Sequence, residues 1–282
     1  MHYSHPTATA SLGSLSDMRK RIDDIDERII HLLMERIQVV QGMSVAKLSA
    51  GEALHSPIRV RSLLKRLTKM AKFPLTEEAI VAIYREVISA SLLAQKRLVV
   101  GFSGCETSLC ARAAHHCFGS SLRYRPFVAP VELLQQTRKH TIDYAVVPDN
   151  AEGLEAIFEA ARDGLELMVF DQVQLSAHAR FWVVGHQSLK YEPGVRFSSL
   201  IVVTAPNVPG SWQNVLIPFT QHNIDLIKMV SLDGPSPSEH TRLYLECNGH
   251  VEDPVLKSAL DSLADSGVKF YRLGSYVDEL EF

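Results

Sequence analysis

Apolar residues recur every three or four positions from Ser14 to Arg97, which is the spacing of the buried face of an α-helix. The first such stretch has no proline and extends to about residue 50, with Ser16 as its expected N-cap. Two shorter helical patterns follow Pro57 and Pro74. The apolar stripe of the first stretch consists of Ile22, Ile25, Ile29, Leu32, Leu33, Val40 and Met43. The pattern predicts three helices, of which the first is about 50 Å long.

The length of the first helix has a consequence for assembly. Its apolar stripe is too long to be buried against two shorter helices of the same chain. Exposed stripes of this kind are normally covered by another subunit, so we expect residues 14–97 to form a helical domain that associates with a second copy.

The pattern changes beyond residue 97 to short apolar runs that alternate with amphipathic stretches. In residues 98–190 the runs LVVGF, YAVVP and FWVVG predict the strands of an α/β lobe. Residues 195–282 follow the order strand, helix, strand, strand, helix, strand, with helices expected over residues 212–222 and 254–265. That order suits a ferredoxin-like βαββαβ module. The expected fold class is therefore multidomain, α followed by α/β.

Composition restricts partners and location. The chain has 282 residues and a net charge of −3, which favours neither nucleic acid nor an anionic membrane as a partner. Residues 1–13 are polar, are expected to be disordered, and lack the basic start and apolar core of a signal peptide. The four cysteines are too few for a secreted disulfide framework, and Cys110 and Cys117 with the histidines between them fit no standard zinc spacing. We therefore expect a cytoplasmic protein that uses no metal and no other cofactor.

Cationic side chains on the first predicted helix are the main candidates for chemistry. Arg36 and Lys47 are eleven residues apart, which is three turns plus roughly 20°, so they share one face about 16 Å apart along the axis. Cations on the inner face of an otherwise apolar helix are not what a structural core needs. They predict a site for a small dianionic molecule.

The whole chain resembles the bifunctional P-proteins, in which chorismate mutase is followed by prephenate dehydratase and an ACT regulatory domain. Its first segment carries the motifs MRKRIDxID, LLMER and VAK, an arginine at position 59, and SxxxQ ending at position 95. These motifs are similar to those of the all-α chorismate mutases. The resemblance implies an intertwined helical homodimer that converts chorismate to prephenate in aromatic amino acid biosynthesis.

The resemblance also implies roles for individual residues. The rearrangement of chorismate needs no nucleophile or base, only a site that holds the diaxial conformer and stabilises charge on the ether oxygen. Lys47 and Gln95 are implied donors to that oxygen. Arg36 is an implied carboxylate ligand, as is Arg19 reaching in from the partner subunit. The remaining implied substrate contacts are Arg59, Ser91, Val60, Ser56, Val40 and Met43.

Two of these positions depart from the mutase pattern. Val60 stands where many mutases have a glutamate that accepts a hydrogen bond from the ring hydroxyl, and Ser56 stands where some have an aspartate. Losing a buried acceptor typically costs about 1–3 kcal/mol. The related isochorismate-pyruvate lyases tolerate an Arg-Val pair here, so lyase activity is one alternative. A noncatalytic regulatory or interaction protein is another.

The second segment resembles a truncated prephenate dehydratase domain. The stretches GCETSLCARAAHHCFG, IDYAVVPDNAEG and HARFWVV are similar to three motifs of that family, but Ala179 stands at the position of the catalytic threonine. Asp171 is followed within ten residues by the last motif, where the family inserts a second lobe. Because one wall of the cleft is missing, we expect a remnant without dehydratase activity.

The third segment resembles the ACT domain on the motifs NVPG, GHVEDP and LGSY. The effector-binding turn of that family corresponds to Asn207, Pro209, Gly210, Ser211 and Trp212. The glutamate and arginine of a second effector motif are absent from residues 230–233, and Trp212 adds bulk where an amino acid would lie. Dimerisation and regulation by another ligand are therefore the two roles expected of this segment.

Overall fold

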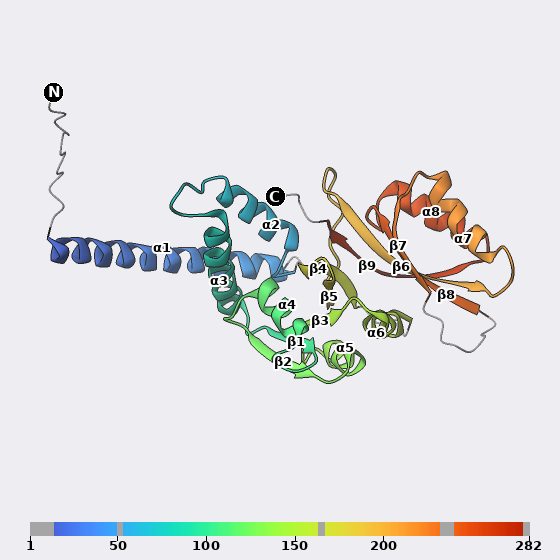
Figure 1. Ribbon diagram of the computed structural model, residues 1–282, viewed down its shortest axis with the longest axis horizontal. Helices are drawn as coiled ribbons and strands as arrows, with labels where there is room; N and C mark the ends of the chain where they lie inside the picture. Colours follow the sequence, from blue (N-terminus) through green and yellow to red (C-terminus); the bar gives the residue numbers. More distant parts are fainter. Residues whose placement is uncertain (1–13, 50–52, 163–166, 232–239, 279–282) are drawn as a thin grey trace, which may run out of the picture. The chain divides into compact units, whose positions relative to one another are not determined.

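The computed structural model describes residues 14–49, 53–162, 167–231 and 240–278 (Figure 1). The chain divides into two compact units, residues 1–52 and residues 53–282. Helix α1 (Leu15–Ser49) lies in the first unit, and α2 (Pro57–Thr68) and α3 (Glu77–Gln95) lie in the second. The tail predicted to be disordered, residues 1–13, is outside the described residues. None of the described helices combines the length and the hydropathy needed to cross a bilayer.

Helix α1 begins earlier than the sequence suggested. The Ser14 hydroxyl accepts a hydrogen bond from the backbone N–H of Asp17 at 3.2 Å, and the Asp17 carboxylate accepts one from the backbone N–H of Ser14 at 3.0 Å. This reciprocal pair is a capping box, which satisfies two N–H groups that a helix start leaves without partners. The prediction of Ser16 as N-cap was therefore wrong, because Ser16 lies inside the first turn.

Helices α2 and α3 begin at polar caps. The Ser56 hydroxyl accepts from the backbone N–H of Arg59 at 3.3 Å, and the Thr76 hydroxyl accepts from Ala79 at 3.2 Å. Pro57 occupies the first turn of α2, where its missing N–H costs nothing. These local signals explain why the two helices start where the sequence predicted.

Both helices are attached to the α/β part of their own unit. Arg61 on α2 forms an ion pair with Asp171 and donates to the carbonyl of Val277 at 2.7 Å. The Ser89 hydroxyl on α3 accepts from the backbone of Ser121 at 3.0 Å. Gly119, which follows α4 (Leu109–Phe118), has φ 72°, and a Cβ there would lie 2.5 Å from that of Ser89. A glycine is needed at this point for both reasons.

One sheet of nine strands runs through the second unit in the order β2-β1-β3-β5-β4-β9-β6-β8-β7. Its strands are β1 (Val99–Ser103), β2 (Arg123–Phe127), β3 (Tyr144–Pro148), β4 (Met168–Ser176), β5 (Ala179–Gly185), β6 (Phe197–Pro206), β7 (Leu226–Ser231), β8 (His240–Asn248) and β9 (Lys269–Val277). Strand β1 is parallel to both neighbours, whereas β5 is antiparallel to β3 and β4. Strands β4 and β9 join the lobe to the C-terminal strands.

Helices cover both faces of this sheet. The remaining helices are α5 (Pro130–Arg138), α6 (Ala151–Arg162), α7 (Ser211–Gln221) and α8 (Pro254–Asp265). One hydrophobic core contains residues of α5 and α6, a second contains residues of α4 and the end of α3, and a third contains residues of α7 and α8. The C-terminal elements follow the order β6, α7, β7, β8, α8, β9, as the sequence predicted.

Strands β2 and β4 were missed in the sequence. Strand β2 lies at the sheet edge, and three of its five residues are exposed, so it lacks the apolar run expected of a strand. Strand β4 contains the buried carboxylate of Asp171, whose partner Arg61 is 110 residues away. A local pattern cannot reveal a charge that is compensated over that distance.

A buried charged network connects the lobe to the C-terminal module. The Arg180 guanidinium on β5 donates two hydrogen bonds to the fully buried Glu246 carboxylate on β8, at 2.7 and 2.6 Å. Tyr276 on β9 also donates to Glu246. Arg180 further donates to Asp149 at 2.7 Å, and Lys228 on β7 donates to the same carboxylate at 2.9 Å. The network therefore links β5 and the residue that follows β3 to three strands of the C-terminal module.

We expect Arg180→Ala to destabilise the protein by about 3–5 kcal/mol, because it leaves the Glu246 carboxylate buried without its cation. Lys96→Ala is the matched control, since Lys96 pairs with Asp143 but its side chain is 56% exposed, and we expect a loss of about 0–1 kcal/mol. Urea unfolding followed by circular dichroism measures both. Equal shifts of the two unfolding midpoints would contradict the structural role of Arg180.

Candidate functional site

One face of α1 carries the main predicted catalytic cations. Arg36, Val40, Met43 and Lys47 all lie within α1, at positions i, i+4, i+7 and i+11. At about 100° per residue these positions fall within roughly 60° of one another, and they span about 16 Å of helix axis. The face thus presents a guanidinium and an ammonium at its two ends, with two apolar side chains between them.

Arg19 lies on a different part of the same helix. It precedes Arg36 by 17 residues, which places it about 25 Å away along the axis and rotates it by roughly 100° from that face. Lys47 is farther still. A small molecule held between Arg36 and Lys47 is therefore out of reach of Arg19 from the same copy of α1.

The other predicted mutase residues lie in the second unit. Ser56, Arg59 and Val60 are at the start of α2, where the Ser56 hydroxyl is engaged as the N-cap. Arg59 is exposed, and Val60 is half-buried. Because adjacent helix positions differ by about 100°, these two side chains leave the helix in different directions.

Ser91 and Gln95 share one turn at the end of α3. The buried Ser91 hydroxyl donates to the carbonyl of Val87 at 2.7 Å, and the Gln95 amide donates to the carbonyl of Ser91 at 3.2 Å. This bond uses one of the two N–H groups of the Gln95 amide, so the side chain has a second donor for a ligand. The structure thus gathers one group of predicted residues on α1 and another within a single turn of α3.

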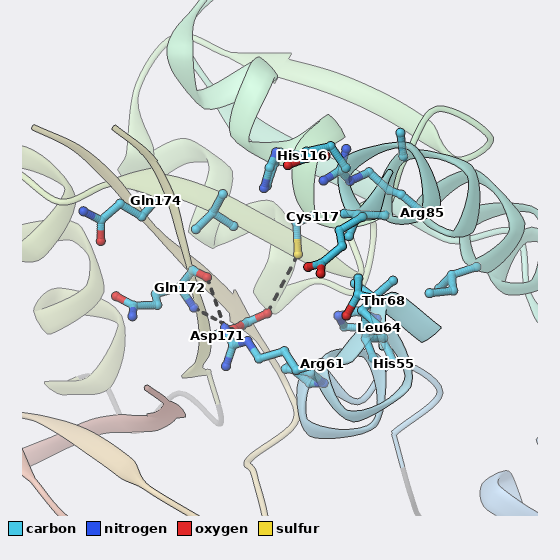
Figure 2. A pocket seen from close by; sticks show the side chains of 18 residues that line it. His55, Arg61, Leu64, Thr68, Arg85, His116, Cys117, Asp171, Gln172 and Gln174 are labelled. Atoms are coloured by element: carbon cyan, nitrogen blue, oxygen red, sulfur yellow. Dashed lines mark hydrogen bonds and ion pairs between the residues drawn. The ribbon is translucent and has the colours of Figure 1, made fainter. Parts of the chain in front are cut away.

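A cavity of about 580 Å³ lies within the second unit, between α2, α3, α4 and β4 (Figure 2). Among the predicted site residues of the described chain, Val60 alone lines it. Apolar walls come from Leu64, Val81, Ile88 and Val173, and the polar groups include His55, Arg61, Arg85, Cys117 and Asp171. The sequence did not predict this cavity, because its walls come from four elements that are distant in the chain.

Burial controls the titration of the groups in this cavity. Burial raises the pKa of the Asp171 carboxyl, although the neighbouring Arg61 guanidinium opposes the rise. Burial also raises the pKa of the Cys117 thiol well above its usual value, and the negative charge of Asp171 adds to that effect. The thiol is therefore protonated at neutral pH, and its Sγ donates weakly to Asp171 at 3.9 Å.

The residues of the dehydratase-like motif lie at the start of β5. Ala179 is the first residue of this strand, and Arg180 and Phe181 follow it. The Arg180 guanidinium binds the carboxylates of Asp149 and Glu246. Its charge is thus neutralised within the protein.

The predicted effector residues surround the start of α7. Gly210 has φ 88° and precedes the helix, Ser211 is buried, and Asn207 and Pro209 are exposed. Trp212 is 40% exposed, so its ring does not fill a closed pocket of a single chain. Residues 232 and 233 of the second effector motif are outside the described residues.

Comparisons with known proteins show which families the chain resembles. The model of the family described as chorismate mutase type II matches residues 18–96. The bifunctional chorismate mutase/prephenate dehydratase of Stutzerimonas stutzeri is 23% identical over 354 residues, which cover 93% of this chain and 97% of the relative. The corresponding protein of Aquifex aeolicus is 34% identical over 143 residues, which cover 49% of this chain and 39% of the relative.

The solved structures agree on the fold. The prephenate dehydratase of Streptococcus mutans superposes with a TM-score of 0.54 at 20% identity, covering 64% of this chain and 98% of that one. The second unit therefore contains a mixed α/β fold that resembles prephenate dehydratase.

This chain is shorter than its alignment with the bifunctional relative. The alignment with the Stutzerimonas protein extends over 354 positions, whereas the whole chain has 282 residues. Many aligned positions of the relative therefore have no counterpart here. The chain is nevertheless homologous over most of its length to the bifunctional chorismate mutase/prephenate dehydratases, and the model of the chorismate mutase type II family matches its residues 18–96.

Proposed function

We propose that this protein is a chorismate mutase that converts chorismate to prephenate. The observation that carries the proposal is the face of α1 formed by Arg36, Val40, Met43 and Lys47, within a segment that matches the family. Two cations about 16 Å apart along one helix suit a ligand with two carboxylates lying between them, because long cationic side chains can converge from both ends.

In the proposed mechanism the protein acts by binding and charge stabilisation. Arg36, Arg59 and Ser91 hold the substrate carboxylates and select the compact conformer, in which the reacting carbon atoms are close. Lys47 and Gln95 donate to the ether oxygen as negative charge develops on it. Val40, Met43 and Val60 supply apolar walls that exclude water, which strengthens these interactions. No proton transfer and no cofactor are required.

A second copy of the chain completes the proposed site. Arg19 is about 25 Å along α1 from Arg36, so it serves a site other than that of its own Arg36 and Lys47. The exposed apolar residues Ile22, Ile25 and Ile29 follow one face of α1 and offer a surface for pairing. In the resulting homodimer each Arg19 reaches a carboxylate in the partner's site.

Isochorismate-pyruvate lyase activity is the second candidate, favoured by one observation. Val60 has a hydrocarbon side chain, which offers no acceptor for the ring hydroxyl that distinguishes chorismate. A site that recognises carboxylates and an ether oxygen but not that hydroxyl discriminates poorly between the two isomers.

We propose that the dehydratase-like lobe is catalytically inactive. Ala179 lacks the hydroxyl of the family's catalytic threonine. Arg180 is held by two carboxylates of the protein, so it is not free to bind a carboxylate of prephenate. The alignment with the bifunctional relative has more positions than the chain has residues, and we attribute the difference to a missing second lobe that would form one wall of the cleft. The lobe then serves as a support for α2 and α3.

The C-terminal module is proposed to be an ACT-type regulatory or dimerisation domain. Its βαββαβ order and the Gly210 turn before α7 support this assignment. The motif residues around Gly210 and the exposed ring of Trp212 lie on the surface of one chain, where a second copy or an effector has access to them.

Purified protein supplied with chorismate is expected to accumulate prephenate, without further conversion to phenylpyruvate. Chorismate loss is followed by absorbance, and the products are separated by chromatography. Supplying isochorismate in parallel and measuring salicylate fluorescence tests the lyase. Loss of neither substrate at high enzyme concentration would reject both catalytic functions and leave the noncatalytic role, and formation of phenylpyruvate would reject the inactive lobe.

Lys47→Ala and Gln95→Ala are each expected to reduce kcat by about a hundredfold to a thousandfold, because each removes a donor to charge that exists only in the transition state. Lys20→Ala is the matched control: Lys20 is exposed on α1 and about 160° away from the face of Arg36. Circular dichroism and gel filtration should show unchanged helix content and assembly. A variant that keeps a near-normal rate removes its residue from the mechanism.

Val60→Glu is expected to raise kcat/KM for chorismate about tenfold, because a carboxylate restores an acceptor for the ring hydroxyl. It should not raise the rate with isochorismate, whose hydroxyl lies elsewhere on the ring. Val60→Leu serves as the control for changes in side-chain size. An unchanged or lower chorismate efficiency in the glutamate variant would mean that the missing contact does not limit turnover.

A further inference from the structure

Three side chains with metal-binding atoms meet at the cavity between α2, α3, α4 and β4 (Figure 2). His55 precedes α2, Cys117 lies in the last turn of α4, and Asp171 lies in β4. One potential ligand atom from each residue lies within 4.8 Å of the other two. These residues come from three separate parts of the chain, so no spacing motif in the sequence reveals them.

The separations are close to those of a bound transition metal. Zinc bonds of about 2.0–2.3 Å in a tetrahedron place neighbouring ligand atoms roughly 3.3–3.8 Å apart. Cys117 Sγ and Asp171 Oδ2 are already 3.9 Å apart, and Figure 2 shows these two side chains directed toward each other. Binding would require the Cys117 and Asp171 side chains to move slightly toward the ordered His55 ring, because the three atoms lie within 4.8 Å of one another.

The two oxygens of the Asp171 carboxylate have different surroundings. Oδ1 accepts from the Arg61 guanidinium and from its neighbour's backbone N–H at 2.9 Å. Oδ2 faces Cys117. A carboxylate that is held through one oxygen and presents the other is the usual arrangement of a metal ligand supported by outer hydrogen bonds.

The surroundings of His55 fix its ring. The ring is 3% exposed and contacts the aromatic rings of Phe118, Tyr144 and Phe170, with centroid distances of 4.9, 6.0 and 6.3 Å. The Gln187 side chain donates to the backbone carbonyl of His55 at 3.2 Å, which holds the segment that carries the ring. A metal-binding side chain that is already ordered loses little conformational entropy when the metal binds.

The charged side chains around the cluster lower its affinity for a divalent ion but do not prevent binding. A thiolate and a carboxylate together neutralise a divalent ion, whereas Arg61 and Arg85 repel it. Glu77 and Glu78 line the same cavity and offset these two cations. Nitrogen, sulfur and oxygen donors in one set favour zinc or cobalt over magnesium or calcium, which prefer oxygen alone.

We propose that His55, Cys117 and Asp171 bind one zinc-class divalent ion, with its fourth position open to the cavity for water or a small anionic ligand. The ion links the entry of α2 to α4 and β4. Cys117 loses its proton when the ion binds, and the proton passes to solvent.

Cobalt is the probe of choice, because its spectrum reports thiolate coordination. The full-length protein, treated with chelator and then titrated with Co²⁺, should bind one equivalent and develop a thiolate-to-cobalt charge-transfer band. Because binding displaces the thiol proton of Cys117, the apparent Kd should fall as the pH rises. Zn²⁺ should displace the cobalt and abolish the band.

The variants assign the ligands. Cys117→Ser should abolish the charge-transfer band, and His55→Asn and Asp171→Asn should each raise the Kd at least tenfold. Cys110→Ser and His116→Asn are the controls: Cys110 is buried on the same helix, and His116 lines the same cavity, yet neither belongs to the cluster. Circular dichroism establishes that each variant is folded.

Two results would overturn the proposal. The first is the absence of the band in the unmodified protein at millimolar Co²⁺, which would make the cluster a buried ion pair with a thiol beside it. The second is persistence of the band in Cys117→Ser, which would place the ion at another cysteine. Both readouts are independent of mutase turnover, so failure here leaves the proposed function untouched, and failure of the mutase assay leaves this site untouched.

Discussion

The bidentate contact between Arg180 and Glu246 is the interaction on which the second unit depends. Glu246 is fully buried, and a buried carboxylate is tolerated only when a cation and hydrogen-bond donors surround it. Arg180 on β5 and Tyr276 on β9 supply these donors. The contact thus fixes β5 against β8 and β9 and supports a sheet that continues from the lobe into the C-terminal module. Arg180 is also the arginine of the dehydratase-like motif. While it is paired with Glu246, its guanidinium is not available to bind a substrate carboxylate.

Helix geometry imposes a second constraint, on the mutase segment. A straight helix keeps Arg36 and Lys47 on one face but carries Arg19 far along the axis and around it. A site that uses all three cations therefore needs two copies of α1. The proposal of a dimer therefore rests on two independent sets of side chains, these cations and the exposed apolar stripe of α1.

Local signals predicted most of the secondary structure. Proline and hydroxyl caps marked α2 and α3, and continuous apolar runs marked β1, β3 and β5, because these features depend on neighbours in the sequence. Strand β4 was not predicted, because the charge of Asp171 interrupts its apolar run and the compensating Arg61 is distant in the chain. The start of α1 was predicted two residues too late, because both Ser14 and Ser16 are suitable N-caps. The hydrogen bonds between Ser14 and Asp17 show that Ser14 is the cap.

The candidate site residues also differ in how far they can be predicted from the sequence. The face of Arg36 and Lys47 follows from spacing within one helix. The cluster of His55, Cys117 and Asp171 does not, because it exists only once the entry of α2, α4 and β4 are folded together. The spacing of cysteine and histidine residues in the sequence therefore gives no indication of this cluster.

One residue of the proposed mutase set and the three residues of the cluster line the same cavity of the second unit. Val60 lines it from α2, and His55 lines it from the segment that enters the same helix. The Ser56 cap lies directly after His55 and positions the first turn, which includes Arg59. An ion bound to His55 would therefore restrain the start of α2, and substrate bound against Arg59 would do the same from the other side. Two ligands that order one segment assist each other, and thermodynamic linkage makes that assistance reciprocal.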